Sequence, residues 1–184
     1  MTHPQRGGEP LTLSGGPLGD LAFEWSHDRY THRWQFGDSQ AVVSSVESDA
    51  STVWPHSPPL QQIHQQSFAD GRRVVFGVGM AGRGHWSASF TLVPDLKCWI
   101  VELACRAPLA PERLLSTYQL AGSWQELASD TYASQLGATQ LQMEAIAPAS
   151  CAMVGDGQVA IQPQVVGQGA ATTQWAFRLR VRAA

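Results

Sequence analysis

The sequence is poor in charge and nearly devoid of lysine. Its 184 residues include 12 Lys and Arg and 15 Asp and Glu, and Lys97 is the single lysine. The formal net charge of −3 gives no basic surface of the kind that binds nucleic acid or an anionic membrane. No apolar run approaches the ~20 residues that span a membrane, and the N-terminal residues lack the apolar core of a secretory signal. We therefore expect a cytoplasmic protein with no nucleic-acid partner and no membrane partner.

Cysteine is scarce, and the short-range spacings of metal ligands are missing. Cys98 and Cys105 are separated by an odd number of positions, which points them to opposite faces of a shared strand, and Cys151 is distant from both. The sequence has no H-x-H, H-E-x-x-H or C-x-x-C spacing, and no G-x-S-x-G motif of a serine nucleophile. These absences predict three buried free thiols, no metal site and no cofactor.

What the sequence does contain is alternation of apolar and polar residues with a period of two, the pattern of a β-strand with one buried face. The clearest stretch is 84–93, where Trp86, Ala88, Phe90 and Leu92 share one face. Other segments of this kind, or of short apolar runs bounded by turn residues, are 21–25, 30–36, 39–48, 72–79, 98–106, 138–146, 151–154, 158–166 and 172–183.

The number of strands and the frequent turn signals predict an all-β fold. We expect a single-domain β-sandwich or irregular β-barrel with at most one or two short helices. Residues 1–18 are expected to form a flexible leader and residues 19–184 a single β domain, a size that one hydrophobic core can fill. Within residues 108–130, Pro111 suits the start of a helix whereas LLSTYQL suits a strand, so both structures stay open there.

Three glycines, Gly77, Gly79 and Gly82, spell G-x-G-x-x-G, the motif of a dinucleotide-binding turn. In that fold the motif opens a helix, and Glu102 would lie at the distance of a ribose-binding acid. Residues 84–93 instead keep the period of a strand, so no helix follows the glycines. We interpret the glycines as the bulge and tip of a β-hairpin, where they allow a ligand or another backbone to approach closely.

This hairpin tip is the strongest candidate site in the sequence. Beside the glycines it offers a charge, a titratable ring and an aromatic surface, and tryptophan near Gln-rich loops is typical of surfaces that stack on carbohydrate. The first hypothesis is therefore a noncatalytic binding module for a polar small molecule or a glycan. Its predicted ligand-binding residues are Arg83, His85 and Trp86, with Trp54, His56 and His64 near them.

Two other classes of function stay open. The first is a structural or assembly subunit, such as a homo-oligomer. An all-β chain with a weakly charged surface must protect its edge strands, and pairing with another copy would do so. The other is a metal-dependent or acid/base enzyme, which would gather across strands the residues His32, His56, His64 and His85 with Glu102. Acids within strands, such as Glu144, are more simply interpreted as surface carboxylates that pair with the arginines at 178–182.

Overall fold

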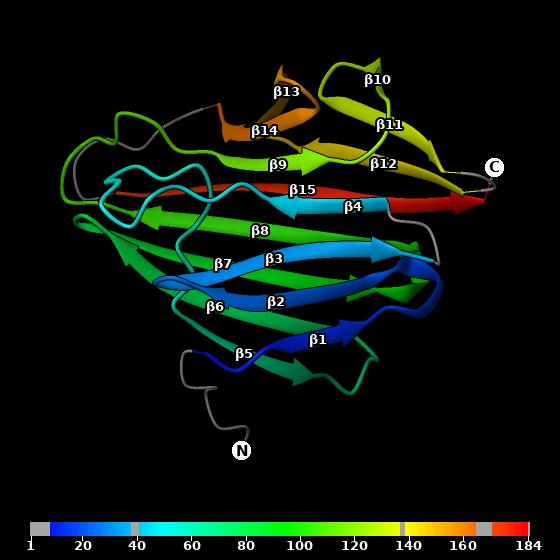
Figure 1. The fold of residues 1–184 in the computed structure, drawn as a ribbon, viewed down its shortest axis with the longest axis horizontal. Helices are drawn as coiled ribbons and strands as arrows, with labels where there is room; N and C mark the ends of the chain where they lie inside the picture. The colour runs from blue at the N-terminus through cyan, green and yellow to red at the C-terminus, as the bar shows by residue number, and fades with distance from the viewer. Residues whose placement is uncertain (1–7, 38–40, 137–138, 165–170, 184) are drawn as a thin grey trace.

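In the computed structural model, which describes residues 8–37, 41–136, 139–164 and 171–183, two antiparallel sheets pack face to face (Figure 1). The sheets do not close into a barrel, so the all-β prediction is confirmed in its sandwich form. In spatial order the seven-stranded sheet contains β1 (Leu11–Ser14), β2 (Asp20–Ser26), β3 (Arg29–Phe36), β4 (Ala41–Ser45), β9 (Ser116–Leu120), β14 (Gln158–Pro163) and β13 (Ala149–Gly155). The eight-stranded sheet contains β10 (Trp124–Ala128), β11 (Thr131–Leu136), β12 (Thr139–Ile146), β15 (Thr172–Ala183), β8 (Cys98–Arg106), β7 (Gly84–Val93), β6 (Arg73–Ala81) and β5 (Gln62–Ser67).

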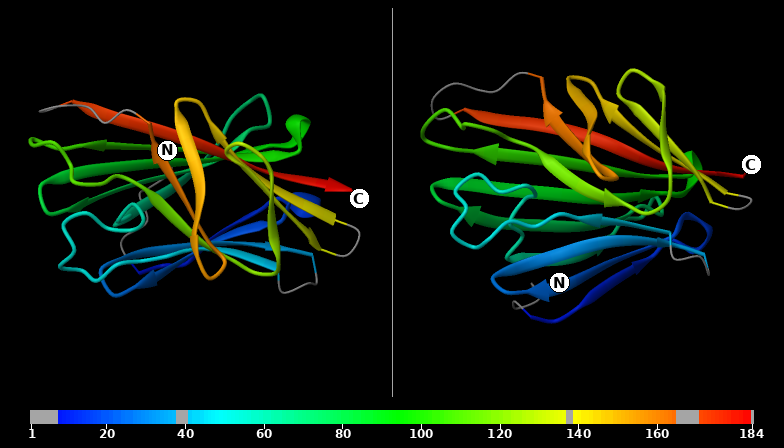
Figure 2. Two further views of the ribbon diagram at one scale, coloured as in Figure 1. Left: turned by 90° about the horizontal axis from the view of Figure 1, so that it is seen from above. Right: turned by 45° about the horizontal axis from the view of Figure 1, so that its top comes forward.

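The hydrophobic core fills the space between the two layers, which Figure 2 shows as β1–β3 on one side and β6–β8 with β15 on the other. Trp34 and Tyr118 enter this space from the seven-stranded sheet, and Phe90, Trp99 and Phe177 enter it from the eight-stranded sheet. All five side chains are fully buried, and Tyr118 packs on Phe177 with ring centroids 5.1 Å apart. The alternation in the sequence therefore reports which face of each strand meets the core.

The segment that the sequence left open between helix and strand is extended. β9 pairs with β4 and β14, and β10 follows it from Trp124. Thr117 and Tyr118 are residue types that favour strands, and this preference prevails over the helix start offered by Pro111. The short helices among the described residues are 3-10 turns, η1 (Gly16–Leu18) and η2 (Pro94–Leu96). No helix in the described ranges is long and apolar enough to cross a membrane.

Part of the segment that we expected to be a flexible leader, 1–18, belongs to the seven-stranded sheet. β1 pairs with β2 so that Leu11 lies opposite Phe23 and Leu13 lies opposite Leu21. Leu13 is buried in the core, which fixes the register of this short strand. Residues 1–7 lie outside the described residues, so the expectation of a leader stays a prediction there.

The proline-rich loop, residues 46–61, lies at one end of the sandwich (Figure 1). Its backbone is hydrogen-bonded to β3 and β9 of the seven-stranded sheet. The amide of Tyr30 donates to the carbonyl of Leu60 at 2.7 Å, and the amide of Thr117 donates to the carbonyl of His56 at 2.8 Å. The buried hydroxyl of Ser57 donates to the Thr117 carbonyl at 3.1 Å. These bonds hold the loop against the seven-stranded sheet.

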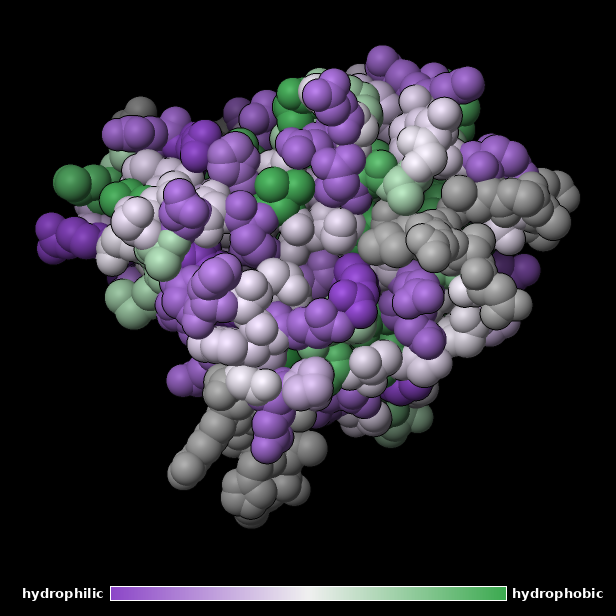
Figure 3. All heavy atoms as spheres, in the orientation of Figure 1, coloured by the Kyte–Doolittle hydropathy of each residue, from purple (hydrophilic) through white to green (hydrophobic). Residues whose placement is uncertain are grey.

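Outward side chains of the seven-stranded sheet are mainly polar. On neighbouring strands β2 and β3, Glu24 and Arg33 form an ion pair at 2.7 Å, although both are largely exposed. Figure 3 shows hydrophilic residues dispersed over the face toward the viewer, with hydrophobic residues among them in small groups. The arrangement is that of an ordinary solvated surface.

Candidate functional site

The outer face of the eight-stranded sheet carries its smallest side chains in the middle and larger ones at the sides. The strand register aligns these outward residues in rows that cross the sheet. One row contains His64, Phe76, Ser89, Glu102, Ala176 and Ile146. The next row contains Gln62, Val78, Ser87, Ala104 and Gln174.

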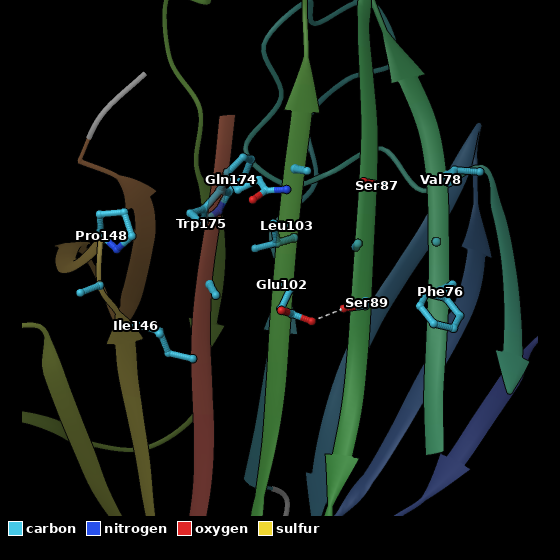
Figure 4. Close-up of a pocket in the computed structure, with 15 residues that line it drawn as sticks. Phe76, Val78, Ser87, Ser89, Glu102, Leu103, Ile146, Pro148, Gln174 and Trp175 are labelled. Carbon is cyan, nitrogen blue, oxygen red and sulfur yellow. Dashed lines mark hydrogen bonds between the residues drawn. The ribbon is translucent and has the colours of Figure 1, made fainter. Parts of the chain in front are cut away.

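The small residues form the floor of a hollow of about 480 Å³. Figure 4 shows Phe76 and Val78 on one side of this hollow and Ile146 and Pro148, at the β12–β13 turn, on the other. Polar groups lie between these apolar walls: the hydroxyl of Ser89 donates to a carboxylate oxygen of Glu102 at 3.0 Å. The hollow thus combines an apolar rim with hydrogen-bonding groups on its floor.

Two further hollows continue the first one toward the β6–β7 hairpin tip. The second, of about 540 Å³, shares Val78, Ser87 and Ala104 with the first. The third, of about 630 Å³, shares Met80, His85 and Arg106 with the second. We call the three together the trough. It follows the direction of the strands from the Glu102 row to the tip, on a face whose backbone is fixed by sheet pairing.

The structure places two of the predicted ligand-binding residues, Arg83 and His85, at the tip end of the trough. Both are exposed, and His85 lies opposite Arg106 on the neighbouring strand. His64 lines none of the three hollows, but its ring stacks on that of Phe76, a wall residue of the first hollow, with ring centroids 5.1 Å apart. Arg83 and His85 thus lie in one hollow, and the binding of a ligand there stays a prediction.

Trp86, by contrast, does not offer the exposed aromatic surface that the sequence analysis assigned to it. It contributes to the edge of the second hollow but is only 2% exposed. Its indole packs edge-on against Trp175 in the core, with ring centroids 5.9 Å apart. It lies on the inward face with Phe90 and Leu92, so its role is to fill the core.

Trp54 and His56 lie in the proline-rich loop and line none of the three hollows. The carbonyl of Trp54 accepts a hydrogen bond from Arg113 Nε at 3.1 Å, and the Trp54 ring packs against the core. Burial, reinforced by the charge of Arg113, lowers the pKa of His56. The structure therefore does not bring these two residues together with Arg83 and His85 in the trough.

The glycines of the G-x-G-x-x-G motif make room for the proline-rich loop on the inner side of β6. A Cβ atom on Gly79 would overlap the backbone carbonyl oxygen of Pro59. Gly82 has a positive φ of 54° at the hairpin turn, and a Cβ there would lie 2.7 Å from Val53 Cγ1. The strand β7 follows directly, so the hairpin is confirmed and the dinucleotide fold is excluded, but β6 and β7 pair in continuous register, so the prediction of a bulge at the glycines was wrong.

The floor of the trough was not predicted from the sequence. Ser87 and Ser89 were assigned to the polar face of their strand, but Ala104 and Gln174 join them only because β15 pairs with β8 across a long stretch of chain. A row of unusually small outward residues was the available signal. It has no meaning until the order of the strands is known.

A second polar group of residues is enclosed at the proline-rich loop, and we call it the buried polar cluster: Arg29, His32, Ser45, Glu47 and Tyr118. Ser45 Oγ donates to Glu47 Oε1 at 2.6 Å, and the backbone amide of His32 donates to Ser45 Oγ at 3.0 Å. The Arg29 guanidinium, which is 2% exposed, holds both carboxylate oxygens of Asp28 at 2.8 and 2.9 Å and thereby lowers the pKa of that carboxyl.

Burial is the dominant influence on the ionisable groups of this cluster. It lowers the pKa of His32 to about 3 and raises that of Glu47 to about 7. The pKa of Tyr118 is raised well above its usual value of 10 by burial and by the charge of Glu47. At neutral pH, His32 and Tyr118 are therefore uncharged, and Glu47 is close to its midpoint.

The remaining candidate groups are separated from one another. No three His, Cys, Asp or Glu side chains within the described ranges are placed to hold a metal ion. Glu144 lies 3.8 Å from Arg178 and 3.4 Å from Arg180, which confirms the surface pairing expected for that acid. His64 and Glu102 share a row but are three strands apart, a distance of about 14 Å. The enzyme and assembly hypotheses stay predictions.

All three cysteines are free and buried, as the sequence indicated. Cys98 and Cys105 lie on β8 and, being an odd number of positions apart, point to opposite faces. Burial raises the pKa of Cys105 to about 11 and that of Cys151 to about 12. Such thiols are poor nucleophiles at neutral pH.

Comparison of the chain with protein-family models gives no match, and comparison with curated proteins gives none either.

Proposed function

We propose that this protein is a noncatalytic binding module that holds an oligosaccharide chain along the trough. The observation that carries the proposal is the sharing of residues between adjoining hollows, Val78, Ser87 and Ala104 at one junction and His85 and Arg106 at the other. A ligand that occupies all three hollows must be elongated. A chain of sugar units has this shape.

The chemistry of the lining supports a sugar over other elongated ligands. Each sugar ring has an apolar face and a rim of hydroxyl groups, which match apolar walls such as Phe76 and Ile146 and polar floor groups such as Ser87, Glu102 and Gln174. An acyl chain would leave those floor groups buried without partners, at a cost of about 1–3 kcal/mol each. An oligosaccharide satisfies both kinds of surface.

The position of the trough also disfavours an added peptide strand. β-strand addition needs the unpaired backbone groups of a sheet edge. The trough lies over β6, β7, β8 and β15, whose neighbours in the sheet are already in place. Recognition must therefore proceed through side chains held on a rigid sheet, which lowers the entropy lost on binding.

The acids of the trough support binding without catalysis. Among the described residues that line the three hollows, Glu102 is the single carboxylate. Hydrolysis of a glycosidic bond commonly uses two carboxyl groups on opposite sides of the bond. The Ser89–Glu102 pair is suited to accept and donate hydrogen bonds with sugar hydroxyls.

The test is affinity electrophoresis of the protein through gels that contain a panel of soluble polysaccharides, neutral and acidic. We expect at least one polysaccharide to retard the wild-type protein. Ala104→Phe, which fills the floor where the first two hollows join, should lose at least ten-fold in affinity. Gln35→Phe, an exposed outward position on β3 of the other sheet, is the matched control and should bind normally. Absence of retardation by the whole panel, or equal binding by Ala104→Phe and wild type, would refute the proposal.

A further inference from the structure

We propose that the tip end of the trough is an oxyanion site, so that the chain held there is acidic and carries a carboxylate or sulfate group. This inference rests on the proposed oligosaccharide binding and adds the charge of the ligand and its direction in the trough.

Three side chains that can be cationic meet in the third hollow. Arg106 on β8 lies directly across from His85 on β7, and Arg83 lies at the turn just before β7. All three are exposed and line the same hollow of about 630 Å³. The other lining residues, Met80, Gly82, Ala107 and Pro108, carry no side-chain charge. Positive charge therefore accumulates in this hollow without a nearby acid in its lining.

The two guanidinium groups in the hollow differ from five other arginines of this protein, which lie close to carboxylates. Arg29, Arg33 and Arg72 each form an ion pair at 2.7–2.8 Å, and Arg178 and Arg180 lie near Glu144. Arg83 and Arg106 have neither an ion pair nor a side-chain hydrogen bond within the part of the chain that the structure describes. Their donors are free to take an oxyanion, and the planar fork of a guanidinium matches carboxylate and sulfate oxygens.

The trough is electrically asymmetric along its length. Glu102 and Arg106 both point outward from β8 and are four residues apart, a separation of about 13 Å along the strand. Glu102 repels an anion and offers hydrogen-bond acceptors to hydroxyl groups, whereas the tip attracts an anion. An acidic sugar unit is therefore directed to the tip and uncharged units to the Glu102 row.

The experiment uses inorganic sulfate and acetate as probes and the ring signals of His85 in NMR spectra of the wild-type protein as the readout. Ionic strength is held constant with sodium chloride. We expect a saturable shift of the His85 signals with at least one of the two anions, and which anion binds more tightly distinguishes a sulfated from a carboxylated ligand. Arg106→Gln and Arg83→Gln should each weaken that binding at least five-fold, and Arg106→Lys should retain part of it.

Arg33→Gln is the control, since Arg33 is an exposed arginine on the opposite sheet; its affinity for either anion should equal that of wild type. The backbone amide spectra of all variants check that the fold is retained. Shifts that do not saturate, or that persist unchanged in Arg106→Gln, would overturn the oxyanion site.

The outcome is independent of the oligosaccharide proposal. Ala176→Phe fills the first hollow in the Glu102 row and lines neither of the other two hollows, so it should weaken polysaccharide retardation and leave anion binding at His85 intact. Anion binding without polysaccharide binding would refute the proposed function but keep the oxyanion site. Retardation by neutral polysaccharides without anion binding would keep the proposed function and refute the acidic ligand.

Discussion

The Nε2 atom of His32 lies 3.1 Å from the hydroxyl oxygen of Tyr118 in the interior of the sandwich, although the two residues are 86 positions apart in the chain. Strand β4 lies between β3 and β9 and separates them by one place in the sheet. Both rings also contact the aromatic core, with His32 packed edge-on against Phe90 at 4.7 Å. Through these two rings the buried polar cluster contacts the hydrophobic core. The contribution of the bond to stability can be measured.

The contribution of Glu47 and His32 to the pH dependence of stability should show a plateau. Between pH 4.5 and 6.5 the native state holds one proton on Glu47 and none on His32, and the unfolded chain holds one on His32 and none on the glutamate. Equal proton numbers give no net slope from this pair. Below pH 4.5, stability falls as the pH falls toward 3, because only the unfolded state protonates this histidine. Above pH 6.5 it falls as the pH rises through about 7, where native Glu47 loses its proton.

Glu47→Gln should remove the plateau. With His32 alone, the free energy of unfolding rises with pH across 4.5–6.5, by up to about 1.4 kcal/mol per pH unit. Urea denaturation at a series of pH values measures this slope. Glu126→Gln, at an exposed position on β10, should keep the wild-type curve. Parallel curves for Glu47→Gln and wild type would show that Glu47 is not protonated in the native state.

Tyr118→Phe should lower the free energy of unfolding by about 1–3 kcal/mol, since it leaves the Nε2 atom of buried His32 without its partner. Tyr132→Phe is the control, because the hydroxyl of Tyr132 has no hydrogen bond in the described part of the chain. In the double variant His32→Phe/Tyr118→Phe, the loss should be smaller than the sum of the two single losses. Equal stability of Tyr118→Phe and Tyr132→Phe would contradict a contribution from the bond.

Gly79→Ala should destabilise the protein by about 3 kcal/mol, because the added methyl group overlaps the Pro59 backbone and forces the loop away from β6. Gly71→Ala provides the comparison: its φ is +82° but no atom lies within 4 Å of the added Cβ. It should cost only about 1 kcal/mol of conformational strain. Thermal unfolding of both variants separates lack of space from backbone strain. A larger loss at Gly71 would contradict the close approach of the loop.

The cysteines should be nearly inert in the folded protein. Cys98, Cys105 and Cys151 are buried and their pKa values are raised by burial, so little thiolate forms at pH 8. A thiol-specific chromogenic reagent should label all three rapidly in guanidinium chloride and label the native protein only at the rate of unfolding. Fast labelling of one thiol per native chain would contradict its burial.

The sequence predicted the strands in which apolar and polar residues alternate, as in residues 84–93, but β5 and β11 were missed and β1 was assigned to the leader. The same pattern indicates that Trp86 points inward with Phe90 and Leu92. Trp86 was nevertheless included in the predicted site because it lies close to the glycines in the sequence. The proximity of Arg83 and His85 could be predicted because a hairpin tip is a local feature. The trough depends on which strands become neighbours, and that is decided by pairings such as Gln174 with Ala104, seventy positions away.

β6 is only one peptide layer thick between the proline-rich loop on its inner side and the trough on its outer side. Gln61, at the end of that loop, forms two hydrogen bonds with the backbone of Met80. The Met80 amide donates to Gln61 Oε1 at 3.1 Å, and Gln61 Nε2 donates to the Met80 carbonyl at 3.3 Å. The strand β6 thus contacts the loop with one face and bounds the trough with the other. A shift of the loop must therefore move residues that line the trough. Substitutions in the loop, outside the trough, should consequently change the affinity for the proposed ligand.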